Sequence, residues 1–163
     1  MQENKMEQKL IAVIRIHGKT SLKKGIKDTM NMLRLYKKHT CVLVPNTKDN
    51  IGMITKIKEY VTWGEVSEPT LKKLLEKRGR LALKESLTHD YVKAQLKITL
   101  DDFAKELFTL KKAIKDLPGL KTFFKLSPPR GGFERGGIKT QFASGGAVGY
   151  RKEKINELVE RML

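Results

Sequence analysis

Short apolar runs alternate with amphipathic stretches in the first part of the chain. The run from Lys9 to Ile16 is rich in β-branched residues and stops at Gly18, which is typical of a buried strand. Two later runs, Thr40 to Val44 and Tyr60 to Val66, have the same character. The sequence therefore predicts three strands, separated by segments long enough to hold a helix each.

The segments between these runs have apolar side chains at helical spacing. In the first segment Ser21 is expected to cap a helix whose apolar residues recur at spacings of four, four and three: Leu22, Ile26, Met30 and Leu33. In the second, Asp49 and Asn50 are expected to cap a short helix with Ile51, Ile54 and Ile57 on one face. The pattern predicts β-α-β-α-β over residues 9–66.

Helical periodicity continues less regularly after residue 66. One helix is opened by Ser67 and Pro69 and closed by Gly79. Three more are predicted: one capped by Thr88, one that begins at the capping-box spacing of Thr99 and Asp102, runs through Ile114 and stops at Pro118, and a closing one with Ile155, Leu158, Val159 and Met162. We therefore divide the chain into a core module with its following helix (residues 9–79) and a mostly helical, loop-rich extension (residues 80–163).

Residues 126–150, which we call the Gly/Arg loop, show no period of 3.6 or 2. The loop contains the run Pro128-Pro129-Arg130-Gly131-Gly132-Phe133-Glu134-Arg135-Gly136-Gly137-Ile138-Lys139 and seven of the 13 glycines of the chain. Glycine pairs cost conformational entropy and have no side chain to pack. A loop of this length implies a function or disorder. We expect it to meet a polyanion that the backbone must approach closely.

The charge of the chain supports a polyanionic partner. The 163 residues suit one domain or one domain with an appendage, and 34 Lys and Arg against 18 Asp and Glu give a net charge of +16. Nucleic acid is the first candidate partner and an anionic membrane surface the second. No apolar run reaches the length of a membrane-spanning helix, and the polar opening is unlike a signal peptide. We expect a cytoplasmic protein.

Candidate catalytic and metal-binding residues are few. The single cysteine, Cys41, lies in an apolar run and is expected to be a buried, inert thiol. The three histidines have no metal-ligand spacing, and Asp101 and Asp102 fit the first turn of a helix better than an acid/base pair. The sequence therefore predicts no metal, no cofactor and no enzymatic activity.

The stretch from Arg15 to Lys38 contains eight basic residues and only one acidic residue, Asp28. Lys23, Lys27, Arg34 and Lys38 are predicted to form a stripe on one face of the first helix, with Lys19, Lys24 and Lys37 beside it. A single stripe of this kind is equally typical of a solvated helix face. The density of basic residues between Arg15 and Lys38 favours a surface that binds the phosphates of a nucleic acid.

The Gly/Arg loop itself allows several interpretations. In a phosphate loop the lysine follows the second glycine directly, whereas here Gly137 is followed by Ile138 and the lysine comes one position late. As an RNA-contacting loop, Arg130, Arg135 and Lys139 would supply cations, and Phe133 would stack on a base or anchor the loop on its own domain. A flexible linker, a nucleotide-dependent or RNA-modifying enzyme and a chromatin-type DNA-binding protein remain as alternatives.

The chain resembles the L-thirty family of large-subunit ribosomal proteins. The resemblance rests on the module from Leu10 to Val66, including Asn50-Ile51-Gly52-Met53-Ile54-Thr55-Lys56-Ile57, and on the glycine- and arginine-bearing run above, followed by Gly145-Gly146-Ala147-Val148-Gly149-Tyr150-Arg151. Family members of bacterial type stop near the end of the first module, and a long basic N-terminal arm typical of eukaryotes is absent. The resemblance therefore implies an archaeal form.

The resemblance implies an α+β fold with a small three-stranded antiparallel sheet in the order 3-1-2, close to a ferredoxin-like arrangement, with helices on one side. It also implies a structural constituent of the 50S subunit on the cytoplasmic ribosome, in contact with 23S-type rRNA, 5S rRNA and neighbouring proteins. The loop would become ordered as it threads between RNA helices. The expected RNA-binding residues are Lys19, Lys23, Lys24, Lys27, Arg34, Lys38, Arg130, Phe133, Arg135, Gly136, Gly137, Lys139, Tyr150 and Arg151.

Overall fold

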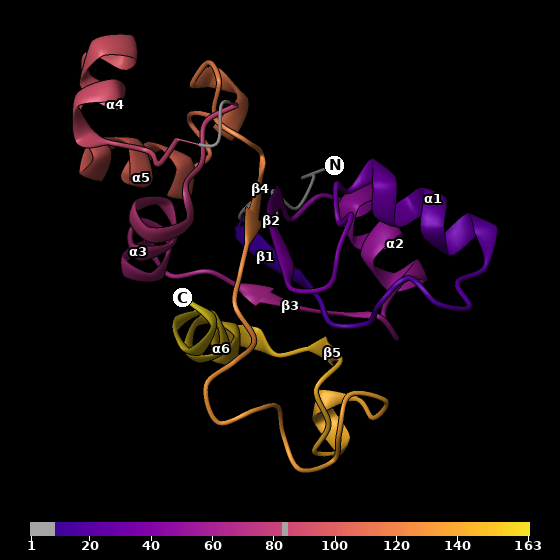
Figure 1. Ribbon diagram of the computed structural model, residues 1–163. Helices are drawn as coiled ribbons and strands as arrows, with labels where there is room; N and C mark the ends of the chain where they lie inside the picture. Colours follow the sequence, from indigo (N-terminus) through magenta and orange to yellow (C-terminus); the bar gives the residue numbers. More distant parts are fainter. Residues whose placement is uncertain (1–8, 83–84) are drawn as a thin grey trace, which may run out of the picture.

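The computed structural model describes residues 9–82 and 85–163, in which helices cover both faces of one sheet (Figure 1). The elements are β1 (Leu10–Arg15), α1 (Lys24–Met32), β2 (Thr40–Pro45), α2 (Lys48–Lys56), β3 (Val61–Glu65), α3 (Glu68–Arg78), α4 (His89–Leu96), α5 (Leu100–Phe108), β4 (Phe123–Lys125), β5 (Gly149–Tyr150) and α6 (Ile155–Met162). Three short 3-10 turns lie at η1 (Ile114–Asp116), η2 (Phe142–Ser144) and η3 (Lys152–Lys154). The predicted β-α-β-α-β order is confirmed.

The sheet has five strands in the order β4-β2-β1-β3-β5. Strands β2 and β3 both pair antiparallel with β1, so the inner three strands have the expected order. The expectation of three antiparallel strands in all is wrong, because β4 pairs antiparallel with β2 and β5 pairs parallel with β3. The two added strands have three and two residues, too few to give a visible period in the sequence.

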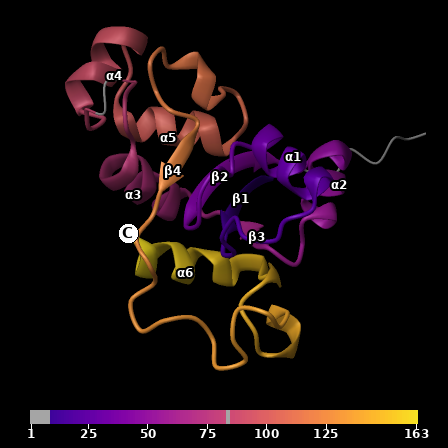
Figure 2. The same ribbon diagram turned by 45° about the vertical axis from the view of Figure 1, so that its right-hand side comes forward.

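Strand β1 is the centre of the core because both of its faces are covered. Its residues alternate between the faces: Ile11 and Val13 pack with α1 and α2, whereas Ala12 and Ile14 pack in the cluster that holds α3, α5 and α6. Burial on both faces explains why the run is apolar without interruption. Helices on one side only were expected, but α3, together with α5 and α6 of the extension, forms a second layer (Figure 2).

Two helix caps differ from the sequence prediction. Ser21 has a positive φ of 58° and lies outside the helix, which begins at Lys24. The cap of α2 is Thr47, whose hydroxyl oxygen accepts a hydrogen bond from the backbone N–H of Asn50 at 3.3 Å. Because α1 ends at Met32, Arg34 and Lys38 lie in the connection to β2 rather than on the helix.

The other predicted boundaries agree more closely. Thr88 and Thr99 cap α4 and α5, and their hydroxyl oxygens accept from the backbone N–H groups of Tyr91 (3.3 Å) and Asp102 (3.2 Å). Helix α5 ends at Phe108, earlier than the apolar pattern indicated, and Ile114 belongs to the separate turn η1. The segment between the two elements includes Leu110 at a positive φ of 56°, which the apolar spacing does not show.

Candidate nucleic-acid interface

The Gly/Arg loop leaves the sheet after β4 and returns to it as β5, below the sheet in the view of Figure 1. The backbone N–H of Leu126 donates to the carbonyl oxygen of His39 at 2.9 Å. The N–H groups of Ser127 and Arg130 donate to carbonyl oxygens of Met162 and Arg161, at 2.9 Å each. The start of the loop is therefore hydrogen-bonded to the residue before β2 and to the end of α6.

Backbone contacts inside the loop account for its glycines. A Cβ at Gly146 would lie 2.0 Å from the carbonyl oxygen of Thr140, and one at Gly136 would lie 2.6 Å from that of Gly145. The other five glycines, at 131, 132, 137, 145 and 149, have positive φ. The seven glycines thus have a role in the fold of the loop itself, whereas Gly136 and Gly137 are also exposed.

Arg151 is buried and holds the loop closed. Its residue exposure is 3%, and its Nε donates to Thr62 Oγ1 at 2.8 Å. Nη2 donates to Glu134 Oε2 at 2.6 Å and to the carbonyl oxygen of Ala147 at 2.8 Å, and Nη1 donates to Glu134 Oε1. The guanidinium carbon also lies 4.6 Å from the ring centre of Phe142. Arg151 was expected to contact RNA, but these internal contacts leave its charge out of reach of a phosphate.

Glu134, in the middle of the loop, is the carboxylate that pairs with the buried guanidinium of Arg151. Burial, the largest single cause, would raise the pKa of the Glu134 carboxyl. The hydrogen bonds from Arg151 and from the backbone, together with the charges of Arg151 and Arg161, outweigh it and hold that pKa below its ordinary value. The carboxylate therefore stays ionised at neutral pH. Its ion pair holds Glu134 beside Arg151, the residue that follows β5.

Phe133 anchors the loop on the core module. Its ring is half-buried and stacks on the ring of His39, with centres 6.1 Å apart and an angle of 12° between the planes. Beside it, Ile138 packs on Ile16, and His17 Nε2 donates to the carbonyl oxygen of Ile138 at 2.8 Å. Of the two roles left open for Phe133, the structure supports the anchoring one.

His39, on whose ring Phe133 stacks, directly follows Lys38 in the chain. Burial, with a further contribution from the charge of Lys38, lowers the pKa of His39. The imidazole beside Phe133 is therefore neutral at neutral pH, and the positive charge of this region comes from lysine and arginine.

Arg15 links the connections before and after α1, which contain Lys19, Lys23, Lys37 and Lys38. It is only 2% exposed, and its side chain donates to carbonyl oxygens of His17 (2.8 Å), Gly18 (2.7 Å) and Leu35 (2.7 Å). Burial lowers the pKa of Arg15, but an arginine remains charged under these conditions. Sequence reasoning assigned no role to Arg15, although an arginine inside a buried apolar run was a visible signal.

Nine of the expected RNA-binding residues are exposed cations: Lys19, Lys23, Lys24, Lys27, Arg34, Lys38, Arg130, Arg135 and Lys139. Within the described part of the chain none of them pairs with a carboxylate, and only Arg34 makes a side-chain hydrogen bond, to Thr122 Oγ1. They lie in α1, in the connections on either side of it and in the Gly/Arg loop, and contacts of His17 and His39 join these connections to the loop. The sequence predicted these cations, and the fold brings their segments together at the end of the sheet where β1 stops.

Among the other candidates, Gly136, Gly137 and Tyr150 are also exposed. Tyr150 is 44% exposed, its hydroxyl donates to Glu65 Oε1, and its ring centre lies 6.2 Å from that of Trp63. Burial and the hydrogen bond with Glu65 raise the pKa of Tyr150 to about 12. The tyrosine therefore presents a neutral ring at the edge of the sheet, next to β3.

The local structure does not support a phosphate loop. Such a loop passes directly into a helix whose N-terminus holds the phosphates. Residues 126–154, all of which the structure describes, contain turns and 3-10 turns but no α-helix. Among residues 9–82 and 85–163 no group of three His, Cys, Asp or Glu side chains is placed to hold a metal ion. In the same residues no helix is both long and apolar enough to cross a membrane.

Comparisons with known proteins place this arrangement in a family. Residues 11–61 match the family model described as Ribosomal protein L30p/L7e. The chain is 43% identical to the large ribosomal subunit protein uL30 of Nanoarchaeum equitans, covering 94% of this chain and 99% of the relative. It is 44% identical to the protein of the same name from Methanopyrus kandleri, covering 91% of this chain and 100% of the relative. Similarity of this extent over nearly the whole length shows that the chain belongs to the ribosomal protein L30p/L7e family.

Proposed function

We propose that the chain is a structural constituent of the large (50S) ribosomal subunit that binds rRNA and supports subunit assembly and translation. The observation that carries the proposal is the set of nine exposed cations that have no carboxylate partner within residues 9–82 and 85–163, on segments that His17 and His39 contacts join. Relatives that are more than 40% identical over nine-tenths of the chain are named as proteins of the large ribosomal subunit. A structural role, rather than an enzymatic one, agrees with this family.

The geometry supports recognition by shape and charge. Backbone hydrogen bonds, the Arg151–Glu134 ion pair and the Phe133 anchor fold the Gly/Arg loop on the free chain. Its exposed cations are thus presented on a preformed surface, which lowers the entropic cost of binding. Irregular folded RNA is read largely through phosphates and backbone shape, for which such a surface is suited. Binding should weaken steeply with salt, because each neutralised phosphate releases counterions.

We assign the rRNA contact to the nine exposed cations, with Tyr150 and the turn at Gly136 and Gly137 beside them. Phe133 and Arg151 act as positioning residues that hold the loop. In this scheme residues 9–79 form the core module with its own basic surface, and residues 80–163 form the extension that adds the Gly/Arg loop. We further propose that 23S-type rRNA and 5S rRNA are both contacted.

Co-sedimentation tests the proposal directly. In lysate of the source organism, the chain should migrate with large subunits in a sucrose gradient at low salt and dissociate as salt rises. Recovery in ribosome-free fractions alone would overturn the proposal. Filter binding of the purified chain to 5S rRNA and to fragments of 23S-type rRNA then distinguishes the two RNA partners. Equal weak binding to both and to an unrelated RNA of the same length would contradict specific recognition.

A further inference from the structure

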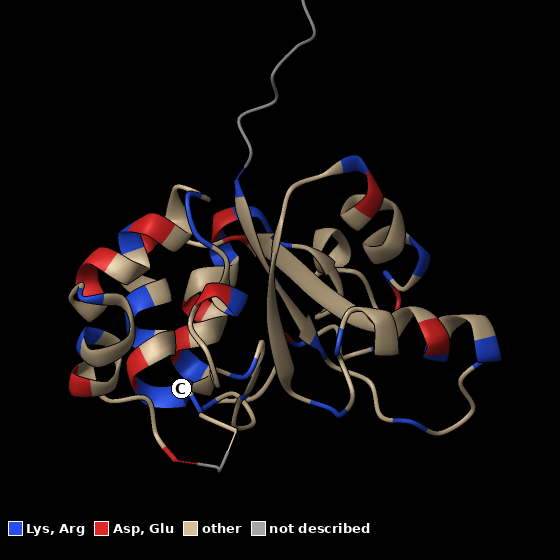
Figure 3. Ribbon diagram, turned by 90° about the horizontal axis from the view of Figure 1, so that it is seen from above, with Lys and Arg blue, Asp and Glu red and all other residues tan. Residues whose placement is uncertain are grey.

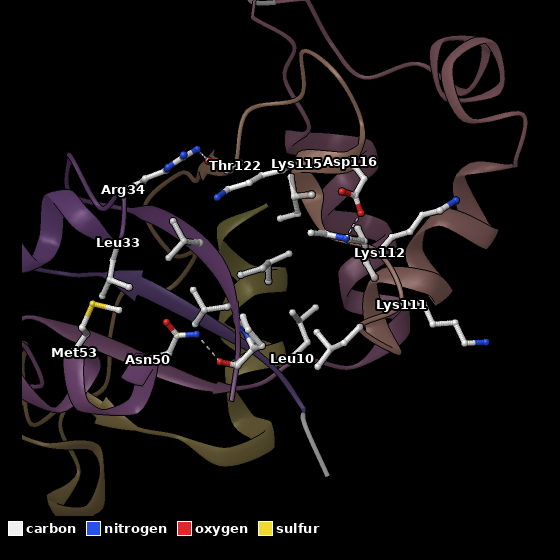
Figure 4. Close-up of a pocket in the computed structure, with 18 of the residues that line it drawn as sticks. Leu10, Leu33, Arg34, Asn50, Met53, Lys111, Lys112, Lys115, Asp116 and Thr122 are labelled. Carbon is white, nitrogen blue, oxygen red and sulfur yellow. Dashed lines mark hydrogen bonds between the residues drawn. The ribbon is translucent and has the colours of Figure 1, made fainter. Parts of the chain in front are cut away.

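A groove of about 620 Å³ lies between β2 with the adjoining ends of α1 and α2 on one side and the segment after α5 on the other (Figure 4). Its lining is mainly aliphatic and comes from both halves of the chain. The described residues that line it include no aromatic side chain. The aliphatic lining residues most relevant here are Leu10, Leu33, Leu43, Val44, Met53 and Leu110.

The groove is open because β4 covers only part of β2. The pairing of the two strands ends at Val42 and Phe123, and β2 continues to Pro45. Leu43, Val44 and Pro45 therefore pair with β1 on one edge and line the groove beyond the end of β4. Met32, at the end of α1, also lines it and is 72% exposed. An apolar surface of this kind is typical of an interaction site.

The rim of the groove is positive. Arg34 and Lys115 lie on one side of it, and the Lys115 side chain extends toward Arg34 and Thr122 (Figure 4). Among the described residues that line the groove, the one acidic residue is Asp116, which accepts a hydrogen bond from the backbone N–H of Ala113 at 2.7 Å and so is engaged with its own turn. The charge of the rim therefore complements a carboxylate.

We propose that this groove binds an extended segment of a partner protein in which aliphatic side chains alternate with Asp or Glu. The aliphatic side chains would lie on Leu43, Val44 and Met53, where methionine adapts to irregular shapes. The carboxylates would pair with Arg34 and Lys115. The inference goes beyond the proposed rRNA contact and does not depend on it.

RNA fits the groove less well than a peptide. Unstacked bases are bound on aromatic rings or arginine planes, and the groove walls are aliphatic. The groove also lies beside Leu10 and Pro45, at the opposite end of β1 from His17 and the Gly/Arg loop. Of the nine exposed cations assigned to rRNA, Arg34 alone also lines the groove, so a protein segment and RNA would share this one residue and otherwise occupy different surfaces.

Fluorescence anisotropy with the full chain tests the proposal. The probe is a short labelled peptide in which Leu and Val alternate with Asp and Glu. Two comparison peptides replace the aliphatic residues with Ser or the acidic residues with Lys. We expect the probe to bind at least about tenfold more tightly than either comparison peptide. Equal affinities for the probe and the Ser peptide would overturn the proposal, because only the net charge of the chain would then attract the probe.

Variants locate the binding to the groove. Lys115→Glu and Met32→Lys change exposed side chains and should each weaken binding of the probe by about fivefold. Lys93→Glu, on α4 and outside the groove, makes the same change of charge and should have little effect. Equal effects of Lys115→Glu and Lys93→Glu would overturn the site. Displacement of the probe by a single-stranded oligouridylate would assign the groove to RNA instead.

Discussion

Arg135 and Arg151 are close in the sequence but have opposite environments. Arg135 is exposed on a turn of the Gly/Arg loop, whereas Arg151 is buried and bonded to Thr62, Glu134 and Ala147. Arg135 can reach a phosphate. Arg151 instead stabilises the folded loop on which Arg135 is exposed. Charge counted along the sequence therefore overstates the number of residues that contact RNA.

Replacing Arg151 with methionine should destabilise the protein by about 3 kcal/mol. The substitution keeps an apolar stem under Phe142 but leaves Glu134 partly buried without its cation. Urea unfolding measures the change. Arg130→Met is the matched control, because the Arg130 side chain is exposed, and it should change the free energy of unfolding by less than about 0.5 kcal/mol. Equal losses in the two variants would contradict the internal role of Arg151.

The same ion pair should make stability depend on pH. The pKa of Glu134 in the folded protein is below its ordinary value of 4.5, so the folded state binds fewer protons than the unfolded state in that range. The contribution is complete above pH 4.5 and is lost as the pH falls through the folded pKa. The stability difference between the natural chain and Glu134→Gln should therefore be constant above about pH 5.5 and shrink below pH 4.5. Unfolding curves across this range check it, and a constant difference down to pH 3 would refute it.

Charge reversal at two exposed loop residues should weaken rRNA binding without unfolding the chain. Arg135→Glu with Lys139→Glu removes two candidate phosphate contacts, so affinity should fall at least about tenfold and the salt slope by about 2. Filter binding at several salt concentrations gives both quantities. The control, Lys93→Glu with Lys97→Glu, makes the same change of net charge in and next to α4. If both pairs weaken binding equally, the Gly/Arg loop has no special part in recognition.

At the scale of elements, a helix or strand could be predicted from the sequence where the interactions that form it join residues close together in the chain. The three inner strands were predictable because β1, β2 and β3 each form an apolar run, and the caps at Thr88 and Thr99 depend on residues three positions away. Strands β4 and β5 form only because distant segments pair with β2 and β3. For the interface, exposed cations could be predicted from the sequence. The role of Arg151 could not, because its partners Thr62 and Glu134 come from distant parts of the chain, and for Arg15 the apolar run signalled burial but not the contact with Leu35.

Two glycine substitutions separate the folded loop from a flexible one. At Gly146 a Cβ would meet the Thr140 carbonyl at 2.0 Å, so Gly146→Ala should destabilise the protein by about 2 kcal/mol. Gly52 lies inside α2 with no atom within 4 Å of an added Cβ, so Gly52→Ala should stabilise it by about 0.5–1 kcal/mol. Thermal unfolding compares the two. An unchanged midpoint for Gly146→Ala would mean that the loop does not fold as described.

At the scale of the whole molecule, charge is distributed unevenly. Residues 15–38 contain eight basic residues and one acidic residue. Residues 89–108, which include α4 and α5, contain Lys93, Lys97 and Lys105 against Asp90, Asp101, Asp102 and Glu106. Figure 3 shows the acidic residues mainly on the side of these helices, on the left of that view. The core module and the Gly/Arg loop are thus suited to RNA, whereas the helical part of the extension is not.

This asymmetry predicts which lysines become protected in the large subunit. Acylation of amines should be slowed most at Lys19, Lys23, Lys24, Lys27, Lys38 and Lys139, since phosphates would cover them, and least at Lys93, Lys97 and Lys105. All nine are exposed in the chain, so differences between free and assembled protein report the partner rather than the fold. Mass spectrometry of both forms after brief labelling gives the ratios. Protection of α4 equal to that of α1 would mean that RNA surrounds the molecule. Protection confined to Lys139 would leave the loop as the whole interface and reduce the lysines around α1 to a solvated surface.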